Sequence, residues 1–263
     1  MSKIPKIIHY VWLGGKPKSE ETLKNIETWK KFNPDYEIIE WNESNSDLTS
    51  CPFVVEAMEQ KKYSFASDWV RLNALKNYGG IYLDTDVEVI KSFDDLLDLD
   101  GFISFENEAH LQNAVMGSKK NPKWINDLIE YFSVRHFVVD GKIDYTSSPV
   151  VQTIYFHKFH NLKYKNSLQK IDDAITAFPC EYFSAKDYTT EKVTITENTY
   201  AIHNFAASWL TKQAKSLAKV LRCIRYIFGK KLFGCFTRMY VKSAEKKYYK
   251  EMKEVFDKKN NKK

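Results

Sequence analysis

Residues 79–86 read GGIYLDTD, which is two glycines, three bulky apolar residues and two aspartates separated by a threonine. The apolar run predicts a short buried strand. The apolar stripe before it predicts a helix over residues 64–78 that stops at the two glycines. The two acidic residues then stand at the carboxyl end of the predicted strand, which is where open α/β sheets bind their ligands.

The segments around this unit repeat the alternation of strand and helix. An apolar run over residues 7–13 predicts a first strand, and residues 36–41 predict a second. Ser19 is placed to cap a helix between them. This alternation predicts an α/β fold with a mostly parallel central sheet. Residues 12–15, 42–45 and 84–86 would then follow the carboxyl ends of three strands.

Asp84 and Asp86 are the strongest indication of chemistry. Alternate residues of an extended chain share a face, and two carboxylates so close repel each other unless a cation lies between them. Carboxylates suit Mg²⁺ or Mn²⁺, which proteins usually share with substrate phosphates. The open alternative is a solvated acidic turn. Gly80, just upstream, lacks a side chain and would let a ligand approach closely.

Asp68 and Arg71 are three residues apart on the predicted helix, so they share one face. They could form a surface ion pair of little consequence for stability. Beside a metal-binding acidic pair, however, the planar guanidinium also matches the oxygens of a diphosphate.

Composition excludes several classes of protein. Hydrophobic residues make up 43% of the chain and aromatic residues 15%, which excludes a disordered or low-complexity chain. The four cysteines form no C-x-x-C pair, so we expect free thiols in a reducing compartment and not a disulfide framework or a zinc ribbon. Neither a leader sequence nor a membrane-spanning run is recognisable, and we expect a cytoplasmic protein.

Charge divides the chain into two parts. Residues 211–263 hold 17 Lys and Arg against 4 Asp and Glu, a net charge of +13, whereas residues 1–210 carry −7. We therefore expect a catalytic domain over 1–210 and a basic helical tail over 211–263. The tail's apolar positions recur at helical spacing: Leu217, Val220, Leu221, Ile224, Ile227 and Phe228, then Leu232, Phe233, Phe236, Met239, Tyr240 and Val241 after Gly229.

Two interpretations of the tail stay open. It could pack on the body as a helical extension, or form an interfacial helix pair on an anionic membrane surface. We favour the membrane and expect the protein on the inner face of the cell membrane. Nucleic-acid binding is disfavoured because the body is acidic and contains no RNA-binding motif.

Several motifs together resemble the family-32 glycosyltransferases, which are DXD-containing sugar transferases related to the catalytic domains of the clostridial glucosylating toxins. The motifs are IPKIIHYVWLGG at 4–15, NPDYE at 33–37, WN at 41–42, SDWVR at 67–71, YGGIYLDTD at 78–86, AIHN at 201–204 and SW at 208–209. The match is strong over residues 4–90 and 201–210 and thin between them. The resemblance implies a GT-A-like, Rossmann-type nucleotide-sugar-binding fold.

The resemblance also implies roles for the donor-binding residues. Trp12 would stack on the base of a nucleotide-sugar, Asp68 would hold ribose or sugar hydroxyls, and Arg71 would hold the sugar or phosphate end. Ser208 and Trp209 would steady the leaving diphosphate. Trp12 and Trp209 could equally be core aromatic residues.

The same resemblance implies the metal site. Asp86 would bind Mn²⁺ or Mg²⁺ directly, Asp84 would contact the ribose and the metal's water shell, and His203 could complete the site. The alternative for His203 is a structural histidine of the core. Between the strong matches, the polar residues 106–110 either line the acceptor site or form a plain loop.

The function implied is a metal-dependent retaining hexosyltransferase. The donor would be a UDP-sugar, UDP-galactose or UDP-glucose, and the acceptor a glycan or a lipid-linked intermediate of capsular or surface polysaccharide synthesis. One alternative is a toxin-like transferase that glycosylates a protein. Another is a non-enzymatic protein that binds an anionic surface or nucleic acid.

Overall fold

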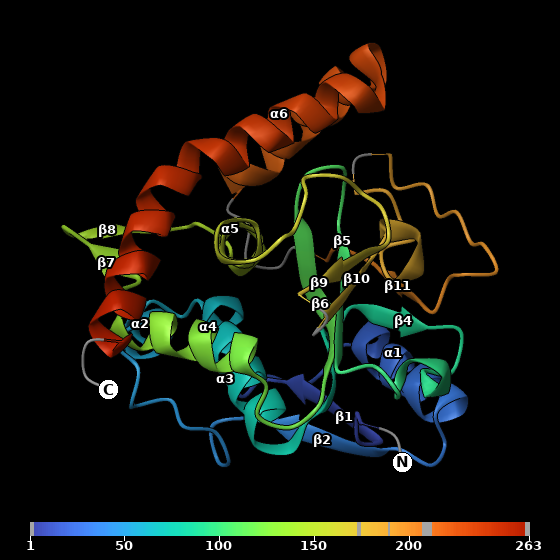
Figure 1. The fold of residues 1–263 in the computed structure, drawn as a ribbon. Coiled ribbons are helices and arrows are strands. Elements are labelled where there is room, and N and C mark those ends of the chain that lie inside the picture. Colours follow the sequence, from blue (N-terminus) through green and yellow to red (C-terminus); the bar gives the residue numbers. More distant parts are fainter. Residues whose placement is uncertain (1–2, 173–174, 189, 207–211, 261–263) are drawn as a thin grey trace.

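The computed structural model describes residues 3–172, 175–188, 190–206 and 212–260, and over 212–233 and at 260 it describes the backbone alone (Figure 1). A seven-stranded sheet with the strand order β2-β1-β3-β6-β5-β10-β9 forms its centre. These strands are β1 (Ile7–Val11), β2 (Glu37–Trp41), β3 (Gly80–Leu83), β5 (Gly101–Phe105), β6 (Leu111–Ser118), β9 (Gln169–Ile171) and β10 (Ile175–Phe178). Only β6 and β9 run against the other five. The predicted α/β class with a mostly parallel sheet is confirmed.

Helices cover both faces of the sheet (Figure 1). Helix α1 (Glu20–Phe32) packs on one face together with the small sheet of β4 (Val87–Val89) and β11 (Ala201–His203). The other face carries α2 (Pro52–Glu59), α3 (Tyr63–Tyr78), α4 (Lys123–Val134) and α5 (Ser148–Phe159). The remaining elements are the hairpin of β7 (Val138–Val139) and β8 (Lys142–Ile143), the 3₁₀ turns at Asp94–Leu96 and Cys180–Tyr182, and the long helix α6 (Lys212–Asn260).

Local sequence signals set the ends of the predicted helices. The Ser19 hydroxyl accepts a hydrogen bond from the Thr22 amide and caps α1. Helix α3 ends at Gly79, whose φ of 70° lies in the left-handed region that favours glycine. Strand β3 follows directly after Gly79, and all four of its residues are buried. Trp29 then fixes α1 to the small sheet, since its indole nitrogen donates to the Val87 carbonyl at 2.8 Å.

Gly80 requires a correction. The space beside its α-carbon is filled by the protein, because a Cβ built there would lie 2.6 Å from the Ile7 carbonyl oxygen and 3.1 Å from His9 Nε2. Its φ is 101°. The missing side chain lets β3 approach β1, so the predicted close approach of a ligand at Gly80 is wrong.

Helix α6 differs from the expected helix pair, because it runs without a break from Lys212 to Asn260. Val241, Tyr248 and Met252 are buried in the same core as α2 to α5. The Tyr248 hydroxyl donates to Asp144 Oδ2 at 2.6 Å, and the Tyr131 hydroxyl donates to Glu251 Oε2 at 2.7 Å. The expected division at residue 210 is therefore wrong for residues 234–260, because this part of α6 packs into the same hydrophobic core as α2 to α5. None of the helices in the described ranges is both long and apolar enough to cross a bilayer.

Candidate active site at the carboxyl end of β3

Asp84, Asp86 and His203 come together just beyond β3. Each offers a ligand atom, and these atoms all lie within 4.8 Å of one another. The Asp84 amide donates to the Ala114 carbonyl of β6 at 2.8 Å, which fixes the start of the turn. Antiparallel pairing of β11 with β4 sets His203 opposite Val87. The predicted acidic pair and the predicted histidine are thus brought together by strands from distant parts of the chain.

Asp86 and His203 lie in direct contact. His203 Nε2 lies 3.4 Å from Asp86 Oδ1, and the Ala206 amide donates to Asp86 Oδ2 at 2.8 Å. Burial by itself would raise the pKa of Asp86, but His203 and the hydrogen bonds outweigh it and lower that pKa to about 2. Burial would likewise lower the pKa of His203, yet the negative charges of Asp86, Asp84 and Glu106 raise it. Asp86 is therefore held as a carboxylate.

The donor set fits a divalent cation. Two carboxylates and one imidazole converge within the distance that one ion can bridge. Carboxylate oxygens suit Mg²⁺ and Mn²⁺, and a nitrogen ligand beside them favours a transition metal such as Mn²⁺. These residues could therefore hold the predicted cation.

Arg71 lies at the centre of a buried network. It is 4% exposed, and its Nη2 lies 3.3 Å from both Asp68 Oδ1 and Asp84 Oδ1. Nη1 donates to the Asn113 carbonyl at 2.7 Å, and Nη2 donates to the Ser67 hydroxyl at 3.2 Å. The guanidinium thus joins α3, β6 and the DXD turn, and the surface ion pair that we considered for Asp68 and Arg71 is excluded.

Asp68 is a buried carboxyl group with an unusual pKa. It is 5% exposed and accepts a hydrogen bond from Asn113 Nδ2 at 3.2 Å. Burial raises its pKa to about 6, although the positive charge of Arg71 opposes this. The pKa of Asp68 therefore lies well above that of Asp86.

Tyr82 is a site residue that the sequence reasoning missed. Its hydroxyl donates to Asp84 Oδ1 at 2.8 Å, and the Arg71 guanidinium carbon lies 4.5 Å from its ring centroid. The sequence could have indicated this contact, because residues 82 and 84 are alternate residues of an extended chain and therefore point to the same face. The Tyr82 hydroxyl therefore helps to orient the Asp84 carboxylate.

Trp12, predicted to stack on the base, can be placed, whereas the residues predicted to steady the leaving diphosphate cannot. It follows β1 at the same edge of the sheet and is partly exposed. Its indole nitrogen donates to the Lys16 carbonyl at 2.7 Å, and Lys18 Nζ lies 5.6 Å from its ring. Ser208 and Trp209 lie outside the described residues.

The polar segment 106–110 connects β5 to β6 beside the site. The Asn107 side-chain oxygen accepts from the amides of Ala109 at 2.9 Å and His110 at 3.3 Å, so the segment is a well-organised loop. Glu106 is close enough to His203 for its charge to raise the pKa of the histidine. A Cβ built on Gly234 of α6 would lie 3.0 Å from Glu108 Cβ, so α6 crosses this loop directly.

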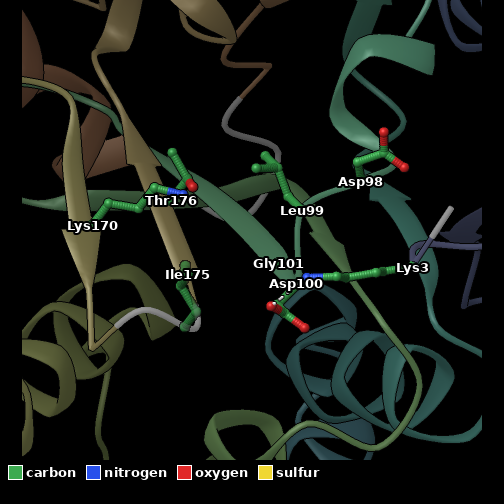
Figure 2. A pocket seen from close by; sticks show the side chains of 8 residues that line it. All are labelled: Lys3, Asp98, Leu99, Asp100, Gly101, Lys170, Ile175 and Thr176. Carbon is green, nitrogen blue, oxygen red and sulfur yellow. Dashed lines mark hydrogen bonds and ion pairs between the residues drawn. The ribbon is translucent and has the colours of Figure 1, made fainter.

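A separate pocket opens at the other end of the sheet. Figure 2 shows that it lies around Asp100 and Gly101, at the start of β5, and it is lined by Lys3, Lys170, Ile175 and Thr176 among others. Lys3 Nζ and Asp100 Oδ2 form an ion pair across it at 3.0 Å. None of its described lining residues belongs to the predicted site.

Known proteins resemble the chain, and a family model matches the segment that contains the DXD turn. Residues 19–103 match the family model described as a glycosyltransferase sugar-binding region containing a DXD motif. The chain is 25% identical over 166 residues to the inositol phosphoceramide mannosyltransferase 3 of Schizosaccharomyces pombe, covering 60% of this chain and 46% of that protein. It is 28% identical over 146 residues to the mannosyl phosphorylinositol ceramide synthase CSH1 of Saccharomyces cerevisiae, covering 54% and 38%.

A solved structure titled PaToxG glycosyltransferase aligns with a TM-score of 0.42 and 25% identity, covering 49% of this chain and 60% of that one. The chain spans less than half the length of the two yeast proteins. The family match contains Asp68, Arg71, Asp84 and Asp86, all of which meet at the site described above. Residues 19–103 of this chain therefore match the DXD-containing sugar-binding region of glycosyltransferases, which agrees with the resemblance predicted from the sequence without specifying family 32.

Proposed function

We propose that the protein is a metal-dependent retaining glycosyltransferase of the family-32 type, which moves a hexose from a nucleotide-sugar to a hydroxyl group of a glycan or lipid-linked acceptor. The observation that carries this proposal is the convergence of Asp84, Asp86 and His203 within 4.8 Å, inside and beside a DXD sugar-binding region. A non-enzymatic role would not require two carboxylates and an imidazole to lie so close together.

Asp84, Asp86 and His203 would hold Mn²⁺ or Mg²⁺. When bound, the cation would act as a Lewis acid that stabilises the negative charge developing on the leaving diphosphate. Asp86 is the main ligand in this proposal, because its pKa of about 2 keeps it a carboxylate at neutral pH. Asp84 is held in place by Tyr82 and Arg71.

Arg71 acts chiefly by positioning. Its guanidinium already contacts Ser67, Asp68, Asp84 and Asn113, so it sets the carboxylates against each other and lowers their mutual repulsion. Asp68, whose carboxyl group lies beside Arg71, is the candidate to hydrogen-bond hydroxyl groups of the ribose or of the transferred sugar. Trp12 is the candidate platform for the base.

In the proposed reaction the acceptor hydroxyl attacks the sugar C1 on the face from which the diphosphate departs. The bond between C1 and the phosphate oxygen breaks, a bond forms between C1 and the acceptor oxygen, and the departing phosphate takes the hydroxyl proton. The α-configuration of the donor is retained, and no covalent intermediate with the protein is required. Stabilisation of the departing charge supplies most of the rate enhancement.

We propose UDP-galactose or UDP-glucose as the donor and a lipid-linked intermediate of surface polysaccharide synthesis as the acceptor. The names of the two yeast relatives specify mannosyl transfer and an inositol phosphoceramide, so their acceptor is itself a lipid. GDP-sugars and protein acceptors are the alternatives that the experiment below separates.

The test is calorimetric titration of UDP and GDP into the protein with and without Mn²⁺, followed by incubation with labelled nucleotide-sugars and lipid, glycan or protein acceptors. We expect binding of one nucleotide that requires the metal. Asp86→Asn should weaken that binding by about a hundredfold, because a neutral amide is a poor ligand for a hard cation. Asp98→Asn, an exposed exchange outside the site, is the matched control. Metal-independent binding, or full affinity in Asp86→Asn, would refute the proposal.

A further inference from the structure

We propose that the outer face of α6 is a docking surface for an anionic lipid bilayer. This outer face is defined by the apolar side chains of Phe236, Met239 and Tyr240 and the basic side chains of Lys242, Lys246 and Lys253. The inference concerns binding to a membrane and does not depend on the proposed transferase activity.

Helix α6 has two distinct sides. Gly234, Val241, Tyr248 and Met252 are buried against the body. They recur at spacings of seven, seven and four residues, which is one side of a helix. Figure 1 shows α6 running along the outside of the molecule past α5, with one side left uncovered by other elements.

The apolar part of the uncovered side is unusually exposed. Phe236 is 48% exposed, Met239 65% and Tyr240 54%. Their spacing of three and four residues places them next to one another on the helix surface. Clustered exposed apolar side chains mark interaction sites more often than scattered ones do. An aromatic pair with a methionine is suited to the boundary between lipid headgroups and acyl chains.

The basic part continues along the same side. Lys242, Lys246 and Lys253 are exposed and lie three, seven and fourteen residues after Met239, close to whole turns of the helix. Within the described residues none of these three lysines forms an ion pair. Before the apolar cluster, the sequence of residues 212–233 contains seven Lys or Arg and no Asp or Glu. The helix is therefore cationic on both sides of its exposed apolar cluster.

This combination favours a bilayer over other partners. Basic charge at an anionic membrane strengthens binding with each lysine or arginine near the surface, and apolar side chains enter the interface. A second copy of the chain on the same face would bring the two sets of lysines against each other, which is repulsive.

The docking surface lies beside the candidate active site. Gly234, two residues before Phe236, packs on Glu108 of the loop next to His203. A bilayer bound to α6 would therefore lie near the β5–β6 loop. If the proposed function holds, this geometry presents a lipid-linked acceptor to the site.

The test uses point variants of the full chain, because Val241, Tyr248 and Met252 belong to the core and deletion of residues 211–263 would open it. Sedimentation is measured with vesicles of phosphatidylcholine alone and with 30% phosphatidylglycerol, at low and high salt. We expect binding to the anionic vesicles only, weakened by salt. The variants Phe236→Ser/Met239→Ser/Tyr240→Ser and Lys242→Glu/Lys246→Glu/Lys253→Glu should each lower the partition coefficient by about tenfold or more.

Control variants change exposed apolar and basic side chains elsewhere on the surface. Leu23→Ser/Leu168→Ser removes exposed apolar side chains, and Lys120→Glu/Lys142→Glu/Lys163→Glu reverses exposed lysines. Both controls should bind within about twofold of wild type. Equal binding to neutral vesicles, equal loss in the controls, or full binding by the α6 variants would overturn the proposal. Light scattering that shows a dimer abolished by the α6 variants, with no vesicle binding, would instead assign this face to a second copy.

Discussion

Nη2 of Arg71 lies 3.3 Å from Oδ1 of Asp84, so a buried cation on α3 is in direct contact with the first carboxylate of the DXD turn. The same nitrogen lies 3.3 Å from Asp68 Oδ1. One guanidinium therefore positions two carboxylates that would otherwise repel each other, and both the stability and the activity of the site should depend on its planar shape.

Arg71→Lys should impair both properties. A lysine ammonium cannot contact Ser67, Asp68, Asp84 and Asn113 together, so part of the network is left unpaired in a buried place. We expect the free energy of unfolding to fall by about 2 kcal/mol and kcat/KM for sugar transfer to fall at least about tenfold. Denaturant unfolding and steady-state kinetics measure the two effects. Lys76→Arg, at a partly exposed position of the same helix, is the control. A wild-type kcat/KM in Arg71→Lys would exclude Arg71 from the site.

His9 should make the protein sensitive to mild acid. Its ring is fully buried, Nε2 lies 2.7 Å from the Gly79 carbonyl oxygen, and Nδ1 accepts from the Trp41 indole at 3.1 Å. The neutral ring thus satisfies both neighbours. Burial lowers the pKa of His9 from 6.5 to about 4, although the hydrogen bond to Gly79 opposes this.

The sign of the effect follows from proton binding. Between pH 6.5 and 4 the unfolded chain binds a proton at His9 that the folded chain does not, so the free energy of unfolding falls as the pH falls. The contribution is complete above pH 6.5, and about 3 kcal/mol is its upper bound. Urea unfolding at several pH values should give a flatter pH dependence in His9→Gln than in wild type. Parallel curves for the two proteins would show that His9 does not titrate in this range.

Two tyrosines of α6 should respond differently to the loss of a hydroxyl group. Tyr248 donates to Asp144 Oδ2 at 2.6 Å in the core, whereas Tyr240 is 54% exposed. Tyr248→Phe leaves the partly buried Asp144 carboxylate without one of its donors, so we expect a loss of about 2 kcal/mol in the free energy of unfolding. Tyr240→Phe should change it by less than about 0.5 kcal/mol. Equal stabilities of the two variants would mean that α6 does not pack on the body as described.

Gly80→Ala should destabilise the protein more than Gly15→Ala. A methyl group at Gly80 meets the Ile7 carbonyl oxygen at 2.6 Å, and it does so at a φ of 101°. Gly15 has a φ of 63° and nothing within 4 Å of the position of a Cβ. We expect losses of about 3 kcal/mol and about 1 kcal/mol in the free energy of unfolding. Thermal unfolding of both variants measures the difference. If Gly80→Ala were as stable as Gly15→Ala but bound no nucleotide, the glycine would after all serve a ligand.

The sequence alone determined the elements whose signals are local. The hydroxyl of Ser19 and the glycine at position 79 act within a few residues of the helix ends that they define. The run Ile81–Leu83 favours a buried strand because Ile81 and Leu83 are apolar and Tyr82 is largely so. Asp84 and Asp86 could therefore be placed at the carboxyl end of a strand, and Asp68 and Arg71 on a shared helical face, without any tertiary contact.

Tertiary structure alone decided which distant segments meet. Strand β6 enters between β3 and β5 against their direction, and its Asn113 completes the network around Arg71. His203 reaches Asp86 only because β11 pairs with β4. In α6, the periodicity of the tail marks apolar positions but cannot tell which of them will be buried. Val241 packs in the core while Met239 stays exposed, because burial depends on whether α4 and α5 offer a complementary surface at that height of the helix.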